Sequence, residues 1–112
     1  MNVEFEEKND RLYVRLFGEL DHHNMLNERN RIEMRISTTT LSEINFDLNG
    51  LTFMDSSGIS LIYNAYKIAK EFGQTVNVIS ENERFIKILT LAGMKKFVKI
   101  ILGRGEKCGN TK

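Results

Sequence analysis

The residues most able to do chemistry in this sequence lie in one short stretch, Asp55-Ser56-Ser57-Gly58. The oxygen atoms of aspartate and serine cap helices by accepting free N–H groups of the first turn. The same N–H groups, together with the helix dipole, also hold a phosphate. The stretch therefore has two interpretations, an ordinary helix cap or a serine that carries a phosphoryl group.

A phosphoryl group on a serine here would change charge rather than fold. It adds about −1.5 to −2 charges and three acceptor oxygens. The dipole of the following helix favours this charge, while the neighbouring Asp55 repels it. The acceptor needs an exposed hydroxyl on a rigid scaffold, which we expect a helix start to provide. We therefore expect a switch that a partner reads on the surface.

Two other chemistries of the same stretch are less well supported. A serine hydrolase needs Gly-x-Ser-x-Gly, and Met54 occupies the first glycine position. A receiver domain would use Asp55 as a phosphoacceptor, with an acidic pair for magnesium and a lysine after a late strand. The segment Gly18-Glu-Leu-Asp21 is a weak substitute for that pair, and no lysine is well placed. The receiver interpretation stays open as an alternative.

The remaining polar residues indicate neither a metal nor a cofactor. His22 and His23 are adjacent, so they point to different sides of a helix, and no Cys, Asp or Glu completes a ligand set. Cys108 is the one cysteine and we interpret it as incidental. No Walker-type or Gly-x-Gly-x-x-Gly loop is present. The basic residues near the C-terminus are expected to be solvated: Lys95, Lys96, Lys99, Arg104 and Lys107.

Composition restricts the class of protein. The 112 residues suffice for one domain, and 41% of them are apolar. Sixteen basic and fifteen acidic side chains leave a net charge of +1, which argues against DNA binding through bulk charge. No apolar run approaches the roughly 20 residues of a membrane span, and no signal peptide is visible. We therefore expect a cytoplasmic protein without direct DNA binding or membrane insertion.

The hydrophobic periodicity predicts strands and helices in the order β-β-α-β-α-β-α-β. Val3 and Phe5 mark a first strand that forms an edge hairpin with the second, which Gly18 ends. Asn49-Gly50 reads as a turn after the third strand. The other predicted strands are 12–17, 44–48, 75–80 and 97–102, and the predicted helices are 22–36, capped by Asp21, 58–72 and 82–92.

This order predicts a single α/β domain, residues 1–102, with a mixed, mostly parallel sheet of about five strands. Residues 103–112 are expected to form a disordered polar tail. Function in such folds gathers where strand ends meet helix starts. If the second and third strands are neighbours, Asp21 and His22 lie beside the stretch 55–58.

Three segments together resemble a known family. These are Gly18-Glu-Leu-Asp-His-His23, Phe53-Met-Asp-Ser-Ser-Gly58 and Leu89-Thr-Leu-Ala-Gly-Met94. They resemble the STAS domain, and more closely the bacterial anti-sigma factor antagonists of the sporulation type, over about residues 3–102. The weak first helix and the run Thr38–Thr40 depart from an ideal member.

The resemblance implies a binding protein without enzymatic activity or cofactor. The implied partner is an anti-sigma factor that is also a serine kinase with a histidine-kinase-type ATPase fold. It phosphorylates the second serine of the motif, Ser57, and the complex then dissociates, while a PP2C-type phosphatase resets the switch. Asp55, Ser56 and Gly58 would shape the loop, and Asp21 and His22 would contact the kinase. The alternative is a STAS module that only scaffolds a larger sensory or lipid-transport complex.

Overall fold

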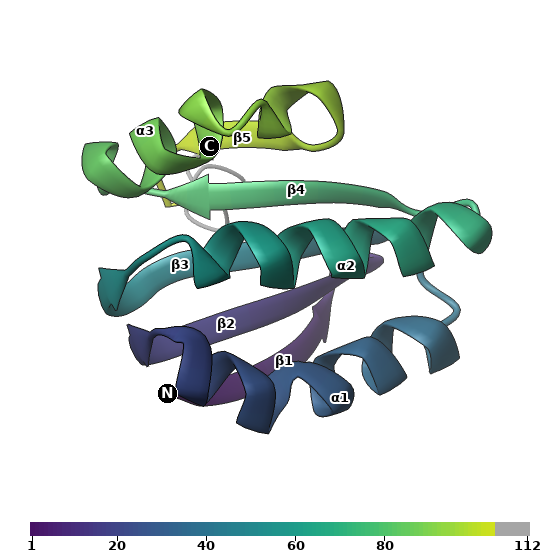
Figure 1. Ribbon diagram of the computed structural model, residues 1–112. Helices are drawn as coiled ribbons and strands as arrows, with labels where there is room; N and C mark the ends of the chain where they lie inside the picture. The colour runs from purple at the N-terminus through teal and green to yellow at the C-terminus, as the bar shows by residue number, and fades with distance from the viewer. Residues whose placement is uncertain (105–112) are drawn as a thin grey trace.

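A five-stranded sheet in the order β1-β2-β3-β4-β5 carries helices on one of its faces (Figure 1). The computed structural model describes residues 1–104. Of the disordered tail predicted at 103–112, residues 105–112, with Lys107 and Cys108, lie outside the described residues. Gly103 and Arg104 are placed by contacts to Ser80 and Glu81, at 2.9 and 2.8 Å, so these two residues are not disordered. The domain boundary at 102 stays a prediction. The elements are β1 Asn2–Lys8, β2 Arg11–Leu20, α1 His22–Thr38, β3 Glu43–Met54, α2 Ser57–Glu71, β4 Thr75–Ser80, α3 Glu83–Leu91, the 3-10 turn η1 Met94–Lys96 and β5 Lys99–Leu102.

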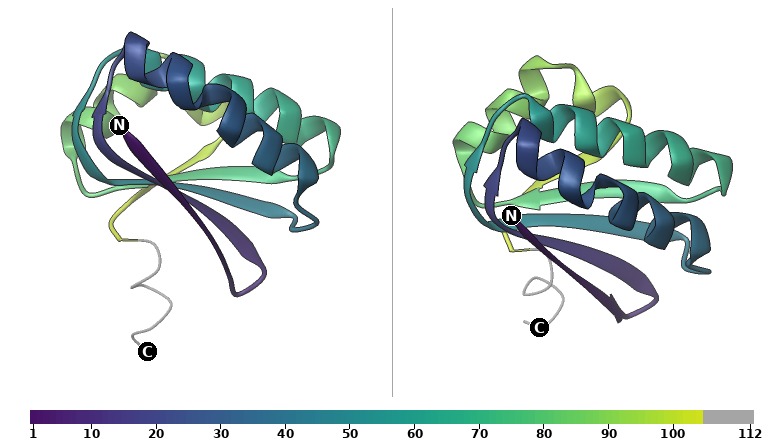
Figure 2. Two further views of the ribbon diagram at one scale, coloured as in Figure 1. Left: turned by 90° about the horizontal axis from the view of Figure 1, so that it is seen from below. Right: turned by 60° about the horizontal axis from the view of Figure 1, so that its bottom comes forward.

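The predicted topology is confirmed. β1 and β2 form an antiparallel hairpin whose turn residues, Asn9 and Asp10, have φ values of 55° and 64°. The pairs β2–β3, β3–β4 and β4–β5 are all parallel. Three helices therefore return the chain from one end of the sheet to the other, and all of them lie on the same face (Figure 2).

The core lies between the sheet and these helices. Alternate residues of β2 and β3 point into it, because successive side chains of a strand face opposite sides. The apolar stripe of α2 packs against them, as its helical spacing predicts. The fully buried residues of this layer include Leu12, Val14, Leu16, Ile44, Phe46, Leu48, Leu61, Ile62, Ala65 and Ala69.

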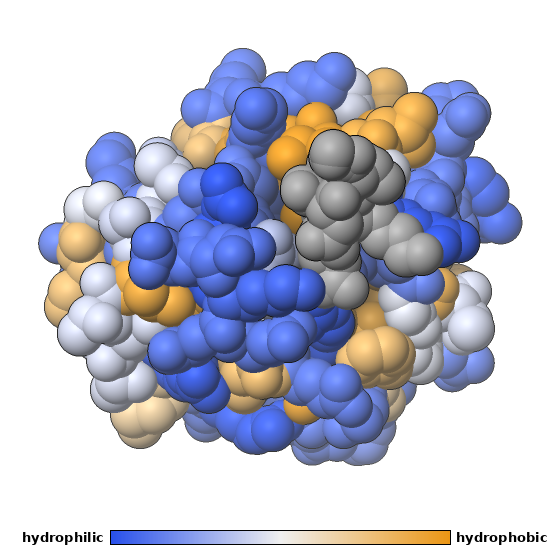
Figure 3. Space-filling view, turned by 180° about the vertical axis from the view of Figure 1, so that it is seen from behind, coloured by the Kyte–Doolittle hydropathy of each residue, from blue (hydrophilic) through white to orange (hydrophobic). Residues whose placement is uncertain are grey.

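The other face of the sheet carries no helix and is mainly hydrophilic (Figure 3). Arg15 lies at its centre and forms ion pairs with Glu6 and with Asp47. Arg11 pairs with Glu43 at 2.8 Å two rows away on the same face, beyond the Tyr13–Asn45 row. Arginine and carboxylate side chains thus pair across three strands, which explains why this face stays polar.

Two predicted breaks do not interrupt the strands. Asn49-Gly50 was expected to form a turn, but β3 runs through it to Met54. The β2–β3 register shifts there, from Arg15↔Asp47 to Phe17↔Gly50, so the extra residue forms a bulge. Gly50 is needed because a Cβ atom would lie 2.3 Å from the Phe17 ring. Gly18, with φ of 93°, likewise lies at a second register shift and does not end β2.

Candidate functional site

The two strand-to-helix junctions singled out in the sequence lie side by side. β2 and β3 are parallel neighbours, and Leu20 pairs with Met54 at their carboxyl ends. The backbone N–H of Asp55 donates to the carbonyl oxygen of Leu20 at 3.3 Å. This hydrogen bond joins the two junctions directly, so the predicted adjacency is confirmed.

Asp21 caps α1 as predicted. Its carboxylate accepts the backbone N–H of Asn24 at 2.9 Å, and its extended backbone is typical of a cap. His22 and His23 are the first two helical residues, and both are exposed. The α1 side of the junction therefore presents one partly exposed carboxylate and two imidazoles.

Asp55, and not Ser56, is the residue that caps α2. Its carboxylate accepts the backbone N–H of Ser57 at 2.8 Å, and its carbonyl oxygen accepts the N–H of Gly58 at 3.0 Å. Ser56 is exposed, has helical dihedral angles and makes no side-chain cap hydrogen bond. Ser56 offers a hydroxyl of the type that caps helices, but it does not cap this turn, because its backbone has already entered the helix.

Ser57 is the first residue of α2 and is less accessible than expected. Only 8% of its surface is exposed, whereas Ser56 next to it is exposed. Our expectation of an openly exposed hydroxyl at Ser57 is therefore wrong for this conformation. The serine lies at the positive end of the helix dipole, in a first turn whose N–H groups already donate to oxygen atoms of Asp55 and Ser56.

Gly58 is buried because the core leaves no room for a side chain at its position. A Cβ atom there would lie 2.5 Å from Sδ and 2.7 Å from Cγ of Met54. Met54 is itself almost fully buried at the end of β3. The glycine thus lets the first turn of α2 lie close against β3, which fixes where Ser57 sits.

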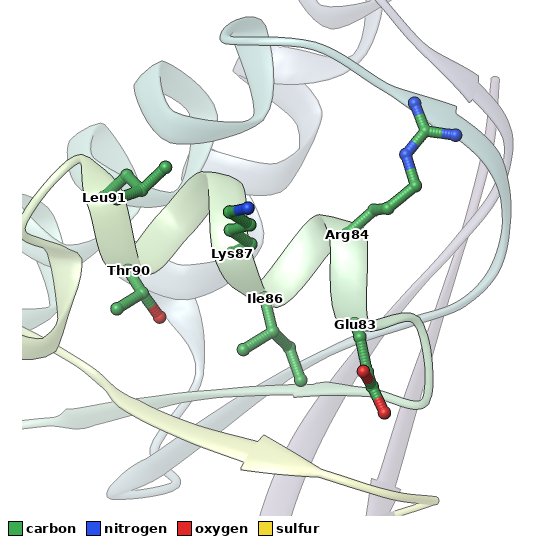
Figure 4. Close-up of a pocket in the computed structure, with 6 residues that line it drawn as sticks. All are labelled: Glu83, Arg84, Ile86, Lys87, Thr90 and Leu91. Carbon is green, nitrogen blue, oxygen red and sulfur yellow. The ribbon is translucent and has the colours of Figure 1, made fainter.

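This edge of the molecule is largely acidic. Asp21 and Asp55 share it with Glu83, because α3 also starts at the carboxyl ends of the strands. The guanidinium of Arg84 makes no ion pair within residues 1–104, and Figure 4 shows it extending from α3 toward the end of β3. A partner with basic groups would complement such an edge.

Phe53 is a surface residue of this edge that sequence reasoning did not assign. It precedes Met54 at the end of β3, and 44% of its surface is exposed. Strand alternation could have identified it, since burial of Met54 turns Phe53 to the opposite face. Aromatic residues of this kind are enriched at the centres of protein interfaces.

A separate hollow of about 520 Å³ lies along α3. Its described lining comes from this single helix, from Glu83 to Leu91 (Figure 4). Charged and apolar side chains alternate along it without converging on one point. Within residues 1–104, no group of three or more His, Cys, Asp or Glu side chains could hold a metal ion. None of the described helices is long and apolar enough to span a membrane.

Comparison with known proteins identifies the family. The family model of the STAS domain matches residues 2–106. The chain is 34% identical over 102 residues to the anti-sigma F factor antagonist of Paenibacillus polymyxa, covering 89% of this chain and 87% of the relative. These matches bear out the expectation of a binding regulator rather than an enzyme.

Solved structures support the same fold. The unphosphorylated anti-sigma factor antagonist SpoIIAA superposes with a TM-score of 0.77 at 23% identity, over 96% of this chain and 92% of that one. The phosphorylated form of the Bacillus cell fate determinant SpoIIAA gives 0.71 at 22% identity, over 99% and 100%. The fold, the joined junctions and the sequence match lead to one conclusion: this chain belongs to the STAS domain family.

Proposed function

We propose that this chain is an anti-sigma factor antagonist that is switched off by phosphorylation of Ser57. In the unphosphorylated form it binds an anti-sigma factor that is also a serine kinase, and this binding releases the sigma factor. The observation that carries the proposal is the hydrogen bond from Asp55 to Leu20, which joins both motif-bearing junctions into one surface. The proposed partner, an anti-sigma factor, is inferred from the 34% identity to an anti-sigma F factor antagonist.

The proposed docking surface contains Asp21, His22, Asp55, Ser56, Ser57 and Gly58. Gly58 contributes indirectly, because it lets α2 start close to β3. Asp21 and His22 lie at the start of α1, across the joined junctions from Ser57. Phe53 adds an exposed ring to the same end of the sheet. The carboxylates of Asp21 and Asp55 suit a partner surface that carries basic groups.

Phosphorylation of Ser57 requires the first turn of α2 to open locally. In the closed turn Ser57 is nearly buried, and its N–H donates one hydrogen bond to the carboxylate of Asp55. Such a bond contributes about 0.5–1.5 kcal/mol, and helix ends open at low free energy. A kinase that docks on this edge could therefore expose the hydroxyl without unfolding the domain.

The phosphate then acts against binding through charge. It places about −1.5 to −2 charges next to Asp55, inside the docking surface. A loss of roughly 3 kcal/mol from the interface lowers affinity more than a hundredfold. The kinase brings its own ATP, so this chain needs neither cofactor nor nucleotide loop. A PP2C-type phosphatase would restore the unphosphorylated form, and we place the cycle in the cytoplasm.

The test incubates the full chain with a candidate anti-sigma factor kinase from the same genome and ATP, and maps the modified residue by mass spectrometry. We expect phosphate on Ser57 in the wild type and in Ser56→Ala, and none in Ser57→Ala. Acid-labile phosphate on Asp55 would instead support the receiver alternative. No modification and no binding with any candidate kinase would favour the scaffold alternative and refute the proposal.

A further inference from the structure

A second hollow, of about 390 Å³, lies at the opposite end of α2 from Ser57. The β4–β5 ladder begins at Asn77↔Lys99, so β5 leaves the first two residues of β4 uncovered. The end of α2 and the segment after α3 flank this gap (Figure 1). The volume is that of a site for one small molecule. Its lining includes Tyr66, Lys70, Gln74, Asn77, Phe97 and Lys99, and we name it the Tyr66–Phe97 pocket.

One wall of the Tyr66–Phe97 pocket is aromatic. The ring centroids of Tyr66 and Phe97 lie 5.4 Å apart, and Tyr63 lies 5.2 Å from Phe97 behind them. These distances are typical of rings that fix one another in place. Phe97 nevertheless keeps 40% of its surface exposed. A preformed, partly open aromatic wall offers a surface on which a planar ligand can stack.

The pocket is also positively charged. Lys70 and Lys99 line it, both are exposed, and neither makes an ion pair within residues 1–104. The arginines behave differently, since six of them pair with carboxylates in the described part of the chain: Arg11, Arg15, Arg29, Arg31, Arg35 and Arg104.

The lysines are not needed to cap α2. Backbone N–H groups already bond the last carbonyl oxygens of this helix, from Phe72 and Gln74 to Ala69 and from Gly73 to Lys70. The negative end of the helix dipole is thereby partly compensated. The ammonium group of Lys70 is therefore available to an anion, and so is that of Lys99 on β5, which makes no ion pair among the described residues.

Gln74 provides an unpaired acceptor beside the same pocket. It is only 8% exposed, and its Nε2 donates to the carbonyl oxygens of Ile36 and Leu41 at 3.4 and 3.1 Å. Because both partners are acceptors, Nε2 must face them, which fixes the orientation of the amide. Its Oε1 is buried without a partner among the described residues. This oxygen has almost no accessible surface, so a donor from the pocket bonds it only when the Gln74 side chain shifts, and such a bond would satisfy the buried acceptor.

We propose that the Tyr66–Phe97 pocket binds a small aromatic anion that carries a hydrogen-bond donor. The ring packs against the tilted pair Tyr66 and Phe97, the anionic group lies between Lys70 and Lys99, and the donor bonds Gln74 after its side chain shifts. This site is separate from the Ser57 junction and does not depend on the proposed function. It gives the domain a place where a small molecule could act on the end of α2.

The test is a titration of the isotope-labelled full chain with para-hydroxybenzoate, followed by amide NMR. We expect saturable shifts at Lys70, Gln74, Asn77 and Lys99, including the side-chain amide of Gln74, and none at Ser57. The neutral para-hydroxybenzyl alcohol and the ring-free acetate should both bind more weakly. Shifts that stay linear with concentration, or that follow every lysine equally, would overturn the proposal, as would the absence of shifts.

Charge variants locate the site. Lys70→Gln and Lys99→Gln should each weaken binding roughly tenfold, since each removes a hydrogen bond from a charged donor. Lys87→Gln on α3 removes the same charge outside the Tyr66–Phe97 pocket and should leave the affinity unchanged. Equal affinities of all three variants would refute the placement. Native-like amide spectra of the unliganded variants would show that any loss is not a folding defect.

Discussion

The carboxylate of Asp55 accepts the backbone N–H of Ser57 at 2.8 Å, and α2 begins at Ser57. The backbone N–H of the same aspartate donates to Leu20, at the end of the neighbouring strand. Asp55 therefore couples the start of α2 to the start of α1. A change at this one residue should affect both the stability of α2 and the alignment of the two junctions.

Removing this carboxylate tests the cap. Asp55→Ala should lower the free energy of unfolding by about 1 kcal/mol, because it leaves the N–H of Ser57 without its partner. Ser56→Ala is the matched control and should change stability little, since Ser56 makes no cap hydrogen bond. Urea unfolding of both variants measures the difference. Equal losses in the two would contradict the assignment of Asp55 as the cap.

Gly58 should tolerate no larger residue while Met54 is present. Gly58→Ala places a Cβ atom 2.5 Å from Met54 Sδ, and overpacking of this kind costs about 1–3 kcal/mol. The higher helix propensity of alanine stabilises the helix by about 1 kcal/mol, so we expect the variant to be less stable than wild type. Thermal or urea unfolding of the variant gives the value.

A double-mutant cycle isolates the cause. Met54→Ala removes the atoms that the new Cβ would meet, so Gly58→Ala should be neutral or stabilising in that background. The same loss in both backgrounds would show that the side chain of Met54 does not explain the glycine.

Much of this architecture could be predicted because it is set locally. The cap at Asp21 and the stripe of α2 depend on residues within a few positions of one another. The bulge at Asn49-Gly50 could not be predicted, because Asn49 bonds partners 32 and 54 residues away, the N–H of Glu81 and the carbonyl of Gly103. A turn-forming dipeptide was thus held in a strand by distant contacts.

The candidate site also has features that the sequence predicts and features that it does not. The two motifs predict which junctions matter, and parallel pairing of neighbouring strands predicts that they meet. The near burial of Ser57 and the exposure of Phe53 depend on packing at the edge of the sheet. Spacing along the chain contains no such information, which is why an exposed Ser57 was expected.

Thr90 offers a test of an unsatisfied hydroxyl. Its Oγ1 is buried without a partner among the described residues. Thr90→Val keeps the shape and removes this group, so stability should stay equal or rise by up to about 1 kcal/mol. Thr90→Ser keeps the hydroxyl but loses a methyl group, and it should be less stable than wild type by about 0.8 kcal/mol. The reverse order in thermal unfolding would indicate that the hydroxyl has a partner.

Substitutions at Ser57 can separate charge from size in the proposed switch. Ser57→Asp and Ser57→Asn introduce side chains of nearly equal shape at a position that is only 8% exposed. Both should fold. In Ser57→Asp the helix dipole favours the added carboxylate by about 0.3–1 kcal/mol, which offsets its repulsion by Asp55. Ser57→Asn adds no charge.

Binding to the anti-sigma factor kinase should then distinguish the two variants. We expect Ser57→Asp to bind at least roughly tenfold more weakly than Ser57→Asn at low ionic strength, since one charge in an interface changes affinity by that order. The gap should narrow as salt is added, because screening weakens repulsion between charges near the surface. Calorimetry at two salt concentrations measures both effects. Equal affinities of Asp and Asn would mean that bulk at the start of α2, rather than negative charge, ends the complex.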